Sequence, residues 1–228
     1  MKKQHLILFL LAISVFPALI QSQHYIRTKK NIGILVNAYV PDYSVYKGTT
    51  SGKFQGTGYA VGITHDIRGF LYPELFFASH MTQVVVPGDH AAWSPAGVTT
   101  NAVGAGLTFK KDLLEFNMKK KKGYCFGRML NILLGPEYVY PLGGSMPSGV
   151  KAEGEFAAKA GLGMYSVWGG SSKSHAGWVI HWEFYYRRSL TPLLQSDFGV
   201  AGNNQYTLSS FGITLRVIHF RTYKFSEM

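Results

Sequence analysis

The sequence has a single cysteine, few acidic residues and no long apolar run after its first twenty residues. The single cysteine, Cys125, excludes an intrachain disulfide, so packing or closed hydrogen bonding must stabilise the fold. A transmembrane helix needs about 18 or more consecutive apolar residues, and no segment after Ile20 supplies them. Charged residues make up only 15% of the chain, and 12 acidic against 23 basic side chains give a net charge of +11. This imbalance predicts an anionic partner.

The first residues have the pattern of a secretory signal peptide. Met1–His5 is short and basic, Leu6–Ile20 is apolar, and Ser22 supplies a small residue before a plausible cleavage point. The apolar run is short for a membrane anchor, and Pro17 lies near its end. We therefore expect residues 1–22 to be a cleaved signal peptide and residues 23–228 to form one domain. For an exported protein, lipid phosphate is a simpler anionic partner than nucleic acid, so we expect no nucleic-acid binding.

The segment Gly177–Arg188, GWVIHWEFYYRR, alternates strictly between two kinds of side chain. Its even positions are apolar or aromatic: Trp178, Ile180, Trp182, Phe184 and Tyr186. Its odd positions are mostly polar or charged: Val179, His181, Glu183, Tyr185 and Arg187. Side chains alternate between the two faces of a strand, so this pattern predicts a strand with one apolar and one charged face. In a soluble protein the apolar face would be core; in a membrane barrel it would contact lipid.

Seven further stretches alternate in a similar way and bring the predicted strands to eight. They are Asn31–Tyr39, Thr57–Asp66, Phe70–Gln83, Thr99–Phe109, Arg128–Tyr140, Glu155–Tyr165 and Thr207–Phe220. These stretches match the roughly 9–11 residues of a transmembrane strand better than the 5–6 of a soluble one. Their second faces are rich in Gly, Ala, Ser and Thr, which suits the narrow interior of an eight-stranded barrel. The sequence therefore predicts an all-β fold, an eight-stranded antiparallel transmembrane β-barrel with a filled lumen.

The connections and the aromatic residues extend this prediction. We expect long outer loops at Val40–Gly56, Val84–Val98, Pro141–Gly154 and Ser189–Tyr206, and a tight inner turn at Ile67–Gly69. Lys110–Gly127 and Ser166–Ala176 are expected as longer inner connections. Aromatic girdles belong at the ends of transmembrane strands. Candidates for them are Phe109, Tyr138, Tyr140, Tyr165, Trp178 and Tyr186.

The mature chain resembles the small outer-membrane β-barrel proteins common in Bacteroidota, sometimes called porin-family or PorT-like proteins. The resemblance lies in Ser22-Gln23, in the Gly-x-Gly repeats at Gly104–Gly106 and Gly161–Gly163, and in LLGPEYVYPL at Leu133–Leu142. It implies an outer-membrane location and a barrel fold. It further implies a link to type IX secretion or gliding machinery, and it implies no activity by itself.

Several charged side chains are predicted to point into the barrel and to form a structural ion network. They are Glu74, Glu137, Lys159, His181, Glu183, Arg187 and Arg216, and Glu155 shares their inward parity. Buried charges must be paired, and a sealed lumen makes that pairing necessary. A catalytic or proton-relay cluster is the alternative interpretation of the same residues.

We expect no enzyme, no metal and no cofactor. Ser172, Ser174 and His175 could only approximate a hydrolase site, on the wrong side of the membrane and without a Gly-x-Ser-x-Gly elbow. His80, Asp89 and His90 lack dense metal-ligand spacing, and a lone exposed loop histidine is the simpler interpretation.

The segment KKDLLEFNMKKKKGY, Lys110–Tyr124, holds six lysines interspersed with apolar residues. It is either a solvated turn or a short amphipathic element that contacts lipid phosphate or an envelope protein. We place this contact at Lys119, Lys120, Lys121 and Lys122. The expected function is that of a non-enzymatic integral outer-membrane component with an accessory, adhesive or assembly role. A soluble exported lipocalin-like barrel that binds an apolar ligand is the alternative.

Overall fold

A computed structural model describes residues 28–47, 54–67, 70–87, 93–121, 124–146, 149–169, 176–196 and 204–222. The predicted signal peptide, Asp197 and the cluster at Ser172, Ser174 and His175 lie outside these ranges, as do Asp89, His90 and Lys122. No helix in the described part is long and apolar enough to cross a membrane.

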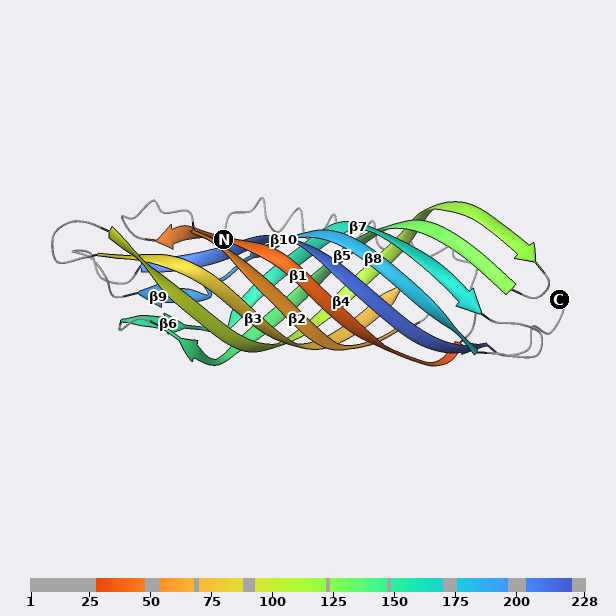
Figure 1. Cartoon of the computed structure of the whole chain (residues 1–228), viewed down its shortest axis with the longest axis horizontal. Coiled ribbons are helices and arrows are strands. Elements are labelled where there is room, and N and C mark those ends of the chain that lie inside the picture. Colours follow the sequence, from red (N-terminus) through yellow and green to blue (C-terminus); the bar gives the residue numbers. More distant parts are fainter. Residues whose placement is uncertain are drawn as a thin grey trace, which may run out of the picture.

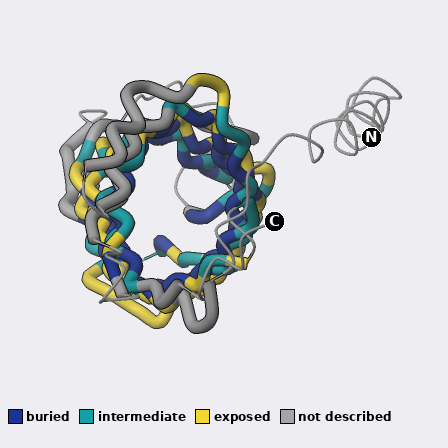
Figure 2. The backbone as a smooth tube through the Cα atoms, turned by 90° about the vertical axis from the view of Figure 1, so that its right-hand side faces the viewer, coloured by how far each residue is buried: buried dark blue, intermediate teal, exposed yellow. Residues whose placement is uncertain are grey.

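Eight long antiparallel strands close into a barrel. They are β1 (Thr28–Lys47), β2 (Phe54–His65), β3 (Leu71–Pro87), β4 (Trp93–Lys121), β5 (Tyr124–Ser145), β7 (Glu155–Gly169), β8 (Ala176–Ser189) and β10 (Asn204–Thr222). Consecutive strands pair with each other, and β1 pairs with β10 to complete the ring (Figures 1 and 2). This closure leaves no free edge around the central wall, as a membrane barrel requires. All eight predicted strands are present, and the predicted fold class is confirmed.

The two ends of the barrel differ. We call the end with the start of β1 and the finish of β10 the terminal end, and the opposite one the loop end. At the loop end, the short strands β6 (Val150–Ala152) and β9 (Leu194–Ser196) pair with each other, and β9 also pairs with β10 (Figure 1). Leu193, Leu194, Tyr206, Leu208 and their neighbours form a buried apolar cluster there. The sequence pattern predicted only two long loops in this region.

The strands are longer than the alternation indicated, so four predicted connections are wrong; one of them, Pro141–Gly154, contains the end of β5 and all of β6. Most of Val40–Gly56 and Val84–Val98 belongs to strands, because β1 runs to Lys47 and β4 begins at Trp93. Lys110–Gly127 is likewise no loop, because β4 continues to Lys121 and β5 begins at Tyr124. Register shifts within this hairpin interrupt the regular alternation, which explains why the pattern was missed.

The outer part of this hairpin leaves the barrel wall. Pairing between β3 and β4 ends at Leu71 and Phe109, and pairing between β5 and β7 ends at Arg128 and Ser166. Beyond these points, apart from a hydrogen bond from Lys110 N–H to the Phe70 carbonyl, the described residues of β4 and β5 pair only with each other. They project past the neighbouring strands at the terminal end (Figure 1). We call this two-stranded projection the basic ribbon.

Candidate functional site: the barrel surface and its lumen

The outer face of the barrel is apolar along every barrel strand. Ile34 is 59% exposed on β1, Phe184 is 60% exposed on β8, and Ile213 is 44% exposed on β10. The residues next to Ile34 and Phe184 in their strands are buried, and Thr214 beside Ile213 is buried as well. A water-soluble barrel would place its apolar set inside, so this polarity excludes the lipocalin-like alternative. It is the polarity of a barrel that spans a lipid bilayer.

The predicted aromatic positions divide into two groups. Tyr138, Tyr140, Trp178 and Tyr186 are exposed on the outer face, as expected of girdle residues. Tyr165 points the other way, and its ring lies 5.0 Å from that of His181 inside the barrel. The prediction for Tyr165 was wrong, because this residue shares the parity of Lys159 and not that of the exposed Leu162.

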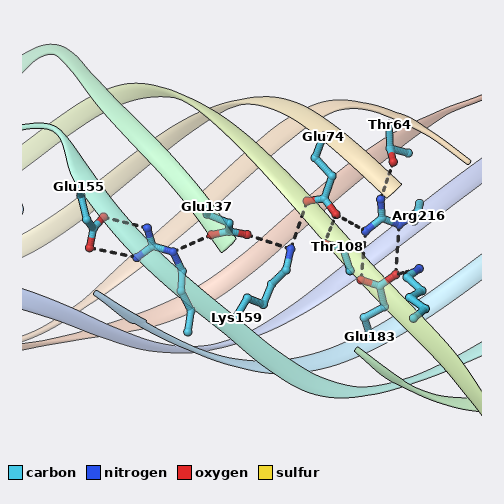
Figure 3. Close-up of polar contacts among 10 residues, drawn as sticks. Thr64, Glu74, Thr108, Glu137, Glu155, Lys159, Glu183 and Arg216 are labelled. Carbon is cyan, nitrogen blue, oxygen red and sulfur yellow. Dashed lines mark hydrogen bonds and ion pairs between the residues drawn. The ribbon is translucent and has the colours of Figure 1, made fainter. Parts of the chain in front are cut away.

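The lumen contains an unbroken chain of ion pairs, which we call the ion network. Acidic and basic side chains alternate along it in the order Glu155, Arg187, Glu137, Lys159, Glu74, Arg216, Glu183 and Lys110. All eight residues are buried. Figure 3 shows how most of them follow one another between the strands. Four carboxylates pair with four cations. With all eight side chains ionised, the ion network therefore carries no net charge.

The links at the centre of the network cross the lumen. Lys159 Nζ on β7 lies 3.1 Å from one carboxylate oxygen of Glu74 on β3 and 2.8 Å from Glu137 on β5. The other oxygen of Glu74 accepts a 2.7 Å hydrogen bond from Arg216 on β10. These bonds tie three non-neighbouring parts of the wall together (Figure 3).

Each end of the network is held by several donors. Arg187 donates two hydrogen bonds to Glu155, of 2.8 and 3.3 Å, and a third to Glu137 at 2.8 Å. Arg216 donates two bonds to Glu183, of 3.1 and 3.2 Å. Lys110 also pairs with Glu183 and lies 3.1 Å from Nδ1 of His181. Charge-assisted bonds with several donors per carboxylate are the kind that offset the cost of burying charge.

Neutral hydroxyl groups complete the coordination of the central ions. The hydroxyl of Thr64 lies 2.6 Å from a guanidinium nitrogen of Arg216, which donates to it. The Thr108 hydroxyl donates to Glu74. The ring of Tyr72 lies 4.1 Å from the ammonium of Lys110 and 5.2 Å from the guanidinium carbon of Arg216. Aromatic faces attract such cations, so the apolar part of the lumen also stabilises the network.

The structure places every predicted network residue inside the barrel. Glu74, Glu137, Lys159, Glu183, Arg187 and Arg216 are joined by ion pairs, and His181 lies beside Lys110 at one end. Lys110 was not among the predicted network residues, because the sequence pattern placed it in a turn. Thr108, Lys110 and Asp112 continue the inward parity of β4, and this period of two was the signal that could have identified Lys110.

The predicted lysine contact has a different structural setting from the one expected. Lys119, Lys120 and Lys121 belong to β4 in the basic ribbon. Leu113 and Leu114, at the base of the ribbon, are 47% and 55% exposed. Three of the lysines that the sequence placed on a turn therefore lie on a projecting pair of strands.

The ion network is better suited to stabilising the barrel than to catalysis. Carboxylates and cations neutralise each other, and His181 lies between the rings of Tyr72 and Tyr165 beside a lysine. Among the described residues no group of three or more His, Cys, Asp and Glu side chains could hold a metal ion. His80 is no exposed loop residue: it is buried on β3, with its Nδ1 3.0 Å from the hydroxyl of Tyr39.

Comparisons with known proteins yield likenesses of shape. No family model and no curated protein sequence matches the chain. The crystal structure of the outer membrane protein OprG from Pseudomonas aeruginosa aligns with 87% of this chain and 100% of its own, at 12% identity and a TM-score of 0.45. Neisserial surface protein A aligns with 82% of this chain and 96% of its own, at 11% identity and a TM-score of 0.35. Ail of Yersinia pestis aligns with 84% of this chain and 99% of its own, at 9% identity and a TM-score of 0.30. No functional conclusion rests on likenesses at this level.

Proposed function

We propose that this chain is an integral outer-membrane β-barrel that conducts no solutes and serves as a membrane-embedded assembly component. The observation that carries the proposal is the cross-lumen pairing of Glu74 with Lys159 and Arg216. An eight-stranded barrel has an interior just wide enough for its own side chains. Paired long side chains that reach across it occupy the path a solute would follow. The apolar outer face supports the membrane location, because closed barrels span membranes where open sheets cannot.

The ion network supports a non-enzymatic role. Every charged residue of the ion network has an oppositely charged partner. Among the described residues of the network, no nucleophilic side chain is paired with a base. A catalytic group must reach its substrate, whereas these side chains are buried and committed to one another. A bracing role accounts for all of these contacts.

A conductance measurement tests the sealed lumen. In planar bilayers the wild type is expected to give no single-channel steps. The double variant Glu74→Ala/Lys159→Ala is expected to conduct, because it removes one anion and one cation from the centre of the lumen. It leaves Arg216 paired with Glu183 and Arg187 paired with Glu137. Heat-modifiable migration on gels verifies that the variant is folded. Reproducible conductance steps from the wild type would contradict the proposal.

The assembly role rests on the basic ribbon. Its two strands pair with each other, and in the described part of the chain neither has a strand partner on its outer side beyond Phe109 and Arg128. Unpaired strand edges accept extended segments of other chains. Its lysines favour an acidic partner or an anionic lipid surface. With the terminal end in the periplasm, the partner is a periplasmic part of an envelope complex. Type IX secretion or gliding machinery is the class implied by the sequence resemblance.

Replacing Lys119, Lys120, Lys121 and Lys122 with glutamine is expected to weaken this association and leave the barrel folded. Each basic residue near an anionic surface contributes roughly 1 kcal/mol, within the screening length of the salt. Crosslinking from position 119 in whole cells measures the association, and raised salt should weaken it in the wild type as well. Gel migration serves as the folding control. Cleavage of the ribbon by protease added outside intact cells would show the opposite topology and refute the periplasmic assignment.

A further inference from the structure

A groove lies on the outside of the barrel where the sheet divides near the loop end. β5 continues to Ser145, but its pairing with β7 stops at Val139 and Glu155. In the described part of the chain, β5 from Tyr140 onward pairs only with β4. The segment before β7 turns away at β6, which pairs with β9 instead. The division leaves a cavity of about 670 Å³ between Tyr140 on one side and Thr191 and Pro192 on the other.

The floor of this groove, which we call the interface groove, is aromatic. The rings of Tyr138 and Phe156 lie 4.6 Å apart at 46°. Gly154 makes this arrangement possible, because a Cβ atom there would lie 2.4 Å from the Tyr138 hydroxyl oxygen. The backbone of Phe156 is fixed on both sides: its N–H donates to the Thr191 hydroxyl at 2.8 Å, and its carbonyl accepts from Leu190 N–H at 2.7 Å. The groove is therefore built into the wall.

The interface groove opens toward lipid and not toward the lumen. Tyr138, Tyr140 and Phe156 all belong to the outward-facing apolar set and are 38%, 55% and 55% exposed. The inward residues beside them, Val139 and Glu155, are buried, and the Glu155 side chain is turned to Arg187 in the ion network and away from the groove. A ligand can therefore reach these rings only along the outer, lipid-facing surface.

The lining combines two kinds of side chain. Tyr138, Tyr140 and Phe156 are aromatic, whereas Glu153 and Thr191 add polar groups. Aromatic side chains that contact apolar groups on one side and polar groups on the other are typical of the membrane–water interface. A concave aromatic site with a few polar groups suits a ligand that is mostly hydrocarbon with a polar end.

We propose that the interface groove holds one acyl chain of a membrane lipid from the leaflet at the loop end. The chain lies over Tyr138 and Phe156, and the polar end of the lipid lies at the level of Glu153 and Thr191. The three aromatic rings already face the hydrocarbon of the bilayer. Because the groove is concave, it contacts more of an acyl chain than the convex outer wall of the barrel does. This inference is independent of the sealed lumen and of the basic ribbon.

Native mass spectrometry tests the proposal on the full-length protein reconstituted in phosphatidylethanolamine and phosphatidylglycerol, then transferred to mild detergent. The wild type is expected to retain one phospholipid per chain. Phe156→Ala removes half of the aromatic floor and is expected to reduce the retained fraction about tenfold. Phe184→Ala is the matched control, because Phe184 is an outward phenylalanine of similar exposure, 60%, that does not line the groove. It should retain lipid like the wild type.

A second variant fills the groove without removing an aromatic ring. In Gly154→Val the new side chain displaces the Tyr138 hydroxyl, so retention should fall as in Phe156→Ala while gel migration stays that of the folded barrel. The proposal is overturned if the folded wild type retains no lipid, if a peptide or a second copy of the chain is retained instead, or if Phe156→Ala and Phe184→Ala retain lipid equally.

Discussion

Glu183→Ala is expected to lower the free energy of unfolding by about 3–5 kcal/mol, the usual cost of removing one partner from a buried ion pair. Glu183 is fully buried and pairs with both Arg216 and Lys110. Its loss would leave Lys110 without its carboxylate partner and Arg216 with Glu74 as its one remaining ion-pair partner among the described residues. The midpoint of urea unfolding in detergent micelles, followed by heat-modifiable migration, measures the change.

The matched control for this substitution is Glu153→Ala, because Glu153 is exposed at the loop end. Substitutions at exposed positions usually change stability by less than about 0.5 kcal/mol. Glu183→Gln keeps the shape of the side chain and one acceptor oxygen but removes its charge and its second acceptor, so its midpoint should lie between those of the wild type and Glu183→Ala. Equal midpoints for Glu183→Ala and Glu153→Ala would show that the ion network does not stabilise the barrel.

The period of two accounts for most of what the sequence could predict. Once Trp178 and Glu183 are assigned to opposite faces of one strand, the face of every other residue of that strand follows. The same argument places Glu74, Lys159 and Arg216 on inward faces without knowledge of their partners. It cannot say which ions meet, because strand tilt and side-chain length decide which residues face one another across the lumen.

The errors have identifiable physical causes. Lys110 is followed by Lys111 and precedes four further lysines, so composition suggested a solvated turn where the strand in fact continues. Tyr165 was assigned to a girdle because it is aromatic and near a strand end, against its own parity. The interface groove could not be predicted, since it depends on where β6 leaves the wall to pair with β9. That pairing joins three-residue strands too short to show any alternation.

Ile213→Arg is expected to impair membrane insertion, because an arginine at the bilayer midplane of a barrel's lipid face costs about 2–4 kcal/mol. Ile213 lies near the middle of β10, opposite Ala38 on β1 and Phe184 on β8, and its side chain is 44% exposed on the apolar face. The yield of heat-modifiable protein in the membrane fraction measures insertion. Leu190→Arg is the control: Leu190 is 63% exposed but lies just past the end of β8 at the loop end, where the cost falls to about 0–1 kcal/mol. A selective loss with Ile213→Arg would mean that depth in the bilayer, and not charge alone, sets the penalty. Normal insertion of both variants would mean that the apolar outer face does not contact lipid.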